Sequence, residues 1–208
     1  MSENPVTGPS KVGAENAGRD DERSSLRRRD RGKDDAWVRA FLEAAPYGYL
    51  ATVDQTGQPF LNSNLFVYDA DRHCIYLHTH RTGRTRDNLD EGDKVAFSAS
   101  AMGRLLPAPE ALEFSVEYCG VAAFGKGRVV DDPEEGKAAL QALLDKYAPH
   151  LKPGRDYRPT TDEELSRTAV YRIDIEAWSG KQKEVEPDFP GAFELPGVPV
   201  PFPRPSMG

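Results

Sequence analysis

The chain has 208 residues and a formal net charge of −7 at pH 7, which disfavours nonspecific binding to nucleic acid. Its two cysteines, Cys74 and Cys119, are too few for a disulfide scaffold and do not form a C-x-x-C motif. No apolar run approaches the roughly 20 residues of a membrane span, and MSENPVTGPS lacks the features of a secretory signal, so we expect a cytoplasmic protein without nucleic-acid or membrane partners.

The N-terminal segment is highly charged but balanced. Residues 1–35 contain eight lysines and arginines, eight aspartates and glutamates, and only three larger apolar side chains, Val6, Val12 and Leu26. Such a composition buries too little apolar surface to offset the entropy lost on ordering. We therefore expect residues 1–33 to be a disordered charged tail, residues 34–184 to form one domain, and residues 185–208, rich in proline and glycine, to form an extended tail.

The first half of the domain begins with a helix and continues as a β-meander. Asp34 or Asp35 can cap the helix, and apolar residues recur on one face from Trp37 to Ala45, before Pro46 ends it. The apolar period then changes to two, which predicts strands at 47–53, 59–69 and 74–79.

The second half alternates short helices with longer strands. We expect helices at 82–89, opened by Thr82 and Gly83, at 132–147, with a capping box from Asp132 to Glu135, and after Thr161, with a capping box to Glu164. Strands are predicted at 94–103, at 114–130, where glycines indicate a bend or bulge, and at 168–178. Six antiparallel strands with few helices between them predict a mainly β fold, a closed or nearly closed barrel.

The stretch HTHRTGRTRDNL, residues 78–89, allows three interpretations. His78 and His80 lie on one strand face and could bind a metal, but the third ligand has no recognisable spacing. The glycine, the threonine hydroxyls, the arginines and a helix N-terminus could instead cradle a phosphate. Solvated arginines at a helix start remain the simplest alternative.

A second polar motif, WSGK at 178–181, leaves the last strand. With this motif, the chain resembles the flavin-binding split-barrel superfamily related to pyridoxamine phosphate oxidase, and within it the nitroimidazole-resistance (Nim-type) branch. The resemblance rests on the order and spacing of YGYLATVDQTGQPFLNSNLFVYD, IYLHTHRTGR, DKVAFSAS, FSVEYCGVAAFGKGRVV and RTAVYRIDIEAWSGK, which span roughly residues 35 to 185.

The resemblance implies a six-stranded split β-barrel that forms a homodimer with FMN at the subunit interface. By this comparison, Gly83 and Arg84 match the phosphate turn, with Thr79 and Arg81 as neighbours. Asn62 and Ser63 flank the ring, and Trp178, Ser179 and Lys181 close the site. His78 matches a histidine beside the flavin in the Nim-type branch and is the candidate catalytic proton donor. No metal is expected.

Two departures from the family pattern affect the site. Many relatives carry a lysine after the glycine–arginine pair, where this chain has Thr85, although Arg86 one residue later could compensate. The substrate-phosphate signature of pyridoxamine phosphate oxidase itself is absent, so vitamin metabolism is not implied.

The expected function is that of an FMN-dependent oxidoreductase acting on a small organic substrate, with an electron donor or acceptor as partner. A noncatalytic carrier of flavin, deazaflavin or haem is the alternative, because the superfamily contains members that bind each of these cofactors and a fold does not fix a function.

Overall fold

The computed structural model describes residues 21–196; the parts of the two predicted tails at 1–20 and 197–208 lie outside the described residues. Its α-helices are α1 (Asp35–Ala44), α2 (Arg84–Glu91), α3 (Pro133–Tyr147) and α4 (Asp162–Ser166). Its strands are β1 (Gly32–Lys33), β2 (Gly48–Val53), β3 (Pro59–Asn64), β4 (Phe66–Asp69), β5 (Cys74–His80), β6 (Lys94–Leu106), β7 (Ser115–Val129) and β8 (Thr168–Lys183).

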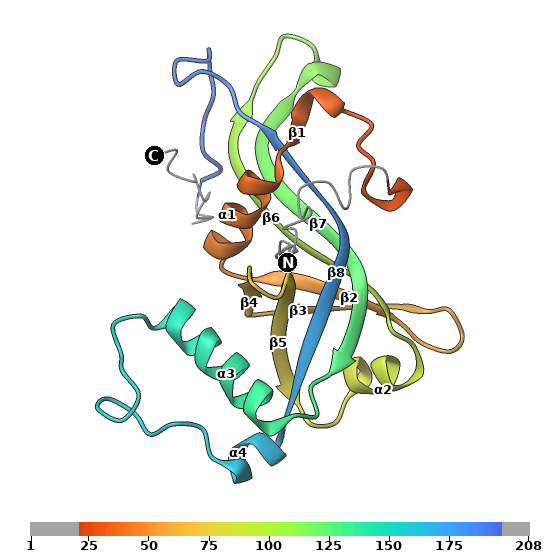
Figure 1. Ribbon diagram of the computed structural model, residues 1–208. Helices are drawn as coiled ribbons and strands as arrows, with labels where there is room; N and C mark the ends of the chain where they lie inside the picture. Colours follow the sequence, from red (N-terminus) through yellow and green to blue (C-terminus); the bar gives the residue numbers. More distant parts are fainter. Residues whose placement is uncertain (1–20, 197–208) are drawn as a thin grey trace, which may run out of the picture.

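The described strands form one antiparallel sheet that curls into a barrel (Figure 1). Its order is β3-β2-β6-β7-β8-β5-β4, and β1 adds to β8 outside this path. The two ends of the path, β3 and β4, are consecutive in the chain and separated only by Leu65. Residues 59–69 therefore supply both of the strands that end this path, β3 at one end and β4 at the other. This arrangement confirms the mainly β fold class.

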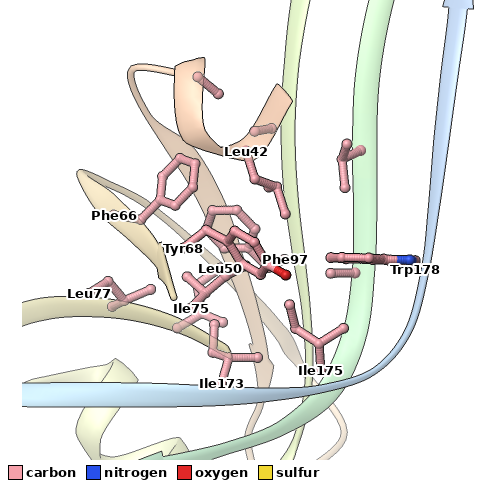
Figure 2. Close-up of a cluster of buried hydrophobic side chains, with 14 of the residues drawn as sticks. Leu42, Leu50, Phe66, Tyr68, Ile75, Leu77, Phe97, Ile173, Ile175 and Trp178 are labelled. Atoms are coloured by element: carbon pink, nitrogen blue, oxygen red, sulfur yellow. The ribbon is translucent and has the colours of Figure 1, made fainter. Parts of the chain in front are cut away.

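Strand alternation explains the core. Leu50, Phe97, Ile173 and their equivalents on the other strands point inward and are almost fully buried, and Figure 2 shows them packed as one cluster. Phe66 and Phe97 meet edge to face with ring centroids 4.7 Å apart, an arrangement that favours aromatic packing. Burying one such ring contributes about 1.5–3 kcal/mol.

Helix ends follow the sequence signals, with two exceptions. Asp34 caps α1 by accepting a hydrogen bond from the Trp37 amide, and the capping box of Thr161 and Glu164 opens α4. Asp132 caps α3, but the predicted capping box with Glu135 is wrong, because that carboxylate accepts hydrogen bonds from Tyr76 and Arg172 instead. Thr82 does not cap α2; the N-cap residue is Gly83.

Two strand details also come from the tertiary structure. The predicted strand 59–69 breaks at Leu65, which, together with the short β1, gives eight strands among the described residues in place of six. The predicted irregularity of the long strand is confirmed: the register of β7 against β8 shifts between Phe124 and Gly125. A Cβ at Gly125 would lie 2.0 Å from the Asp174 carbonyl oxygen, so no larger residue fits there.

Both predicted tails have ordered parts. In the N-terminal segment, residues 21–33, Arg23 forms an ion pair with Glu176 of β8, and Gly32 and Lys33 pair with β8 as β1. This part of the expected disordered tail is therefore packed on the domain. At the other end, Phe193 forms a backbone bridge with Leu105 of β6. No helix in residues 21–196 is long and apolar enough to cross a membrane.

Candidate functional site

The turn between β5 and α2 ends in an open helix N-terminus. Gly83 precedes α2 with a φ of 142°, a backbone conformation that favours glycine, and no atom lies within 4 Å of where its Cβ would be. Within residues 21–196, no side chain caps α2. The first amide N–H groups of the helix therefore lack a side-chain acceptor, and this end of the helix dipole attracts anions.

Polar side chains hold α2 against the end of the barrel. Thr85 is buried and accepts a hydrogen bond from the Asn62 side chain of β3, 3.2 Å away. Asn88 is also buried and donates to the Thr52 hydroxyl of β2 over 2.8 Å. Thr85, where the resemblance implied a lysine, thus faces the barrel, and Asn62 fixes the helix through its hydrogen bond to Thr85.

The two arginines of α2 differ in their partners. Arg84 is exposed, its guanidinium carbon lies 5.2 Å from the centroid of the Phe60 ring, and it forms no ion pair with a described residue. Arg86 forms an ion pair with Asp90 one turn later, over 2.9 Å. Arg84 is therefore the arginine of α2 that is free to meet an anion, whereas Arg86 is already neutralised.

The end of β5 carries the remaining residues of the first motif. Arg81 donates from its guanidinium to the Ser166 carbonyl of α4, and the Thr79 hydroxyl donates to the His80 carbonyl and lies 3.0 Å from the Tyr171 hydroxyl. These contacts tie the strand end to α4 and β8. The Arg81 guanidinium therefore contacts α4, and no contact joins it to Arg84 within the described residues.

His78 points away from the core, because its neighbour Leu77 points inward and is fully buried. It lies on the face of β5 where Tyr76 and Val170 pack with α3 and α4. Its ring is exposed, but the surrounding protein removes part of its hydration and lowers its pKa below the ordinary 6.5. At pH 7 the ring is therefore mostly neutral and suited to accept a proton rather than donate one.

Trp178 lies in the core, not beside α2. The residue is 9% exposed, and its indole N–H donates to Asp35 of α1. Its ring packs against Tyr68 (Figure 2) and against His73. In this chain it joins β8 to α1 and to the β4–β5 turn.

The next residues of the second motif reach the outer face of the barrel. Ser63, Tyr49, Ser98, Ala122 and Ser179 are register partners across β3, β2, β6, β7 and β8. Because strands lie about 4.8 Å apart, Ser63 and Ser179 are separated by about 19 Å along the sheet. The structure thus places Asn62, Gly83 and Arg84 at one end of this row, and Ser179 and Lys181 at the other.

A surface pocket of about 770 Å³ covers the β6–β7–β8 end of that row, and the sequence analysis missed it. Ser98, Ser100, Gly120, Ala122 and Ser179 line it together with Ser25 and Leu26 of the N-terminal segment. One sequence signal could have revealed this pocket: small residues recur at every second position in SASA (98–101) of β6 and in GVA (120–122) of β7. Among residues 21–196, no group of three histidine, cysteine or acidic side chains is placed to bind a metal.

Comparison with protein families identifies a match over residues 34–182 to the model described as pyridoxamine 5'-phosphate oxidase. No curated protein sequence matches the chain.

Solved structures share the fold. A flavocytochrome from Azotobacter vinelandii is 23% identical, with a TM-score of 0.70 over 92% of this chain and 94% of that chain. An FAD- and haem-binding protein from Mycobacterium smegmatis is 26% identical, with a TM-score of 0.64 over 74% of each chain. A protein from Bacteroides thetaiotaomicron, described as a 5-nitroimidazole antibiotic resistance protein, is 19% identical, with a TM-score of 0.59 over 73% of this chain and 89% of that chain.

Proposed function

The chain belongs to the pyridoxamine 5'-phosphate oxidase family, and we propose that it is an FMN-dependent oxidoreductase that holds its flavin between two copies of itself. The observation that carries this proposal is the start of α2. There a helix N-terminus and Arg84, which have no side-chain cap and no ion-pair partner in the part of the chain that the structure describes, meet a glycine with open space around it. A phosphate monoester carries close to two negative charges at neutral pH, and these donors suit it.

A dimer accounts for the separation of the two motifs. Within one chain, Arg84 lies beside Phe60 of β3 and Lys181 lies in β8, at opposite ends of a row of five strands. A two-fold axis near this face would bring the α2 turn of one subunit toward Ser179 and Lys181 of the other. The outer face of β2 and β3 also exposes apolar side chains suited to an interface: Tyr49 is 43% exposed, Val53 46% and Leu61 66%.

Each group has a separate role in this proposal. Bound flavin would supply the electron or hydride chemistry. Arg84 and the first amides of α2 would hold the phosphate, and Asn62 would fix the helix through Thr85. His78, mostly neutral at pH 7, would take up a proton if the substrate reaches the outer face of β5.

Saturating FMN is expected to raise the melting temperature of the purified protein. A ligand that binds only the folded state at 100 times its dissociation constant stabilises it by about 2.7 kcal/mol. Thermal unfolding with FMN, riboflavin, FAD and haem tests this and ranks the cofactors; FAD and haem are included because the relative from Mycobacterium smegmatis binds both. An unchanged melting temperature with every flavin would remove the proposal.

A noncatalytic carrier would also bind flavin, so binding alone does not establish an enzyme. The bound flavin of an oxidoreductase should be reduced by an added reductant and reoxidised by an organic acceptor over many turnovers. A carrier would exchange its flavin with solution without such turnover.

The protein is expected to be a dimer. Light scattering should give twice the chain mass of 23.0 kDa at micromolar concentration. Leu61→Glu should shift the protein to the monomer, because it places a charge on the exposed β2–β3 face. Leu151→Glu, a similar change at a leucine 38% exposed outside the barrel strands, is the control and should leave the dimer intact. A monomeric mass for the wild type with flavin bound would contradict the model.

A further inference from the structure

Lys146, in the last turn of α3, places its ammonium group against the buried core. The Nζ atom lies 3.9 Å from the centroid of the Phe66 ring and 5.3 Å from that of the Tyr147 ring, and it donates to the Leu42 carbonyl over 3.1 Å. Leu42 and Phe66 are fully buried members of the core (Figure 2). The amine therefore lies at the junction of α1, α3 and β4, while the residue as a whole stays partly exposed.

This ammonium group has few polar partners. Within residues 21–196, Lys146 forms no ion pair, and the acceptor of its side-chain hydrogen bond is the Leu42 carbonyl. Glu43 of α1 attracts the charge but forms no ion pair with it. The Tyr147 hydroxyl is already bonded to the amide and the carbonyl of Phe66. An uncharged amine keeps two N–H donors, so it can still bond the Leu42 carbonyl after it has lost a proton.

The surroundings of Lys146 also favour the uncharged amine. Burial removes water from the ammonium and lowers the pKa of Lys146 to about 8 from an ordinary 10.5, although the attraction of Glu43 acts in the opposite direction. Hydrogen-bonded ion pairs instead raise the pKa values of Lys126 and Lys137. At pH 7 about a tenth of the Lys146 side chains are then uncharged, against roughly 0.03% for an ordinary lysine.

A neutral amide is the modification that this position suits. An acylated Lys146 carries no charge that needs water, keeps one N–H for the Leu42 carbonyl and can place a small acyl group beside the two aromatic rings. A carbamate formed from carbon dioxide would instead place a negative charge over the electron-rich face of Phe66, which the ring disfavours. The contacts therefore favour acyl transfer.

We propose that Lys146 is an acylation site for a small activated acyl group of the acyl phosphate class. The lone pair of the uncharged amine forms an N–C bond to the acyl carbon, the C–O bond to the phosphate breaks, and the proton lost by the amine leaves with inorganic phosphate. The donor must be small, because the amine lies between α1 and α3 and the residue is only partly exposed. This site lies at the α1–α3 junction and does not rest on the flavin proposal.

Acetyl phosphate and the full-length protein provide the test, with peptide mass spectrometry measuring acetylation at each lysine. Lys94 and Lys152, which are exposed, are internal references in the same sample. At pH 7.5 Lys146 should be acetylated at least about threefold faster than either reference, because its larger uncharged fraction outweighs its lower basicity. The ratio of these rates should fall above about pH 9, where Lys146 is already uncharged and the references are still losing protons.

The variant Glu43→Gln changes the charge of Lys146 without touching its contacts. Glu43 is exposed, and removing its attraction should lower the pKa of Lys146 further and increase its acetylation at pH 7.5 relative to the references. Glu163→Gln, the same change at an exposed residue of α4, is the matched control and should leave the ratio unchanged. Lys146→Arg keeps a cation at this position but should remove the fastest acetylation seen in the intact mass.

Three results would overturn the proposal. The first is acetylation of Lys146 no faster than that of Lys94 and Lys152 at pH 7.5. The second is a ratio that stays constant up to about pH 10.5, because the amine would then titrate like an ordinary lysine. The third is an equal increase in Glu43→Gln and Glu163→Gln, which would show that the local charge does not control the reaction.

Discussion

Glu117→Ala is expected to lower the free energy of unfolding by about 3–5 kcal/mol, the usual cost of removing one partner from a buried ion pair. The Glu117 side chain is 2% exposed and its carboxylate accepts hydrogen bonds from the Arg104 guanidinium, at 2.7 and 2.9 Å, and from the Val185 amide. Arg104 also donates to the Val185, Glu186 and Pro187 carbonyls. The ion pair therefore holds residues 185–187 against β6 and β7. Urea unfolding should show the lower free energy of unfolding of the variant.

Two controls separate the buried charge from general damage. Replacing the pair together, with Arg104→Met and Glu117→Leu, should cost less than Glu117→Ala alone, because no uncompensated charge remains. Asp93→Ala breaks the exposed pair with Lys126 and should cost less than about 1 kcal/mol. If Glu117→Ala destabilises the protein no more than Asp93→Ala does, the Arg104–Glu117 ion pair does not stabilise the fold as proposed.

The same pair makes stability depend on acid pH. Hydrogen bonds from Arg104 lower the pKa of Glu117 to about 2 from an ordinary 4.5. Because the folded-state pKa is depressed, the contribution is complete above pH 4.5 and is lost as the pH falls toward 2. The difference in stability between the wild type and Glu117→Gln should therefore shrink over this interval.

Arg84→Ala is expected to make the binding free energy of FMN less favourable by about 2–3 kcal/mol. This is the scale of the loss when a charge-assisted hydrogen bond cannot form. Riboflavin lacks the phosphate, so its affinity should stay the same, and flavin fluorescence quenching measures both. Arg86→Ala is the matched control: Arg86 is neutralised by Asp90 and should hardly affect FMN. Equal weakening of FMN and riboflavin would indicate damage to α2, and unchanged FMN binding would mean that Arg84 faces only solvent.

The sequence by itself determined the local elements and the family. Apolar residues at every second position, as in GYLATV of β2 or TAVYRIDI of β8, are properties of a few neighbouring residues, so the strands were predictable from them. The caps of α1 and α4 depend on contacts three residues apart and were predictable for the same reason. The order and spacing of five segments, among them those that end in HTHRTGR and WSGK, suggested the family that the comparison confirmed.

Only the tertiary structure decided what these residues contact. Glu135 lies at the right position for a capping box, but β5 and β8 bring Tyr76 and Arg172 within reach of its carboxylate. Trp178 follows a strand pattern that fits either face, and the shift of register at Gly125 and the contact with Asp35 place it in the core.

The relation between the two motifs likewise depends on pairing between distant strands. The sheet order puts four strand spacings between Ser63 and Ser179, and no spacing along the chain contains that information. The low content of apolar side chains in residues 1–33 predicted disorder. Composition does not record that Glu176, Tyr118 and the edge of β8 offer partners to Arg23, Arg31 and Gly32, which order the segment over the pocket.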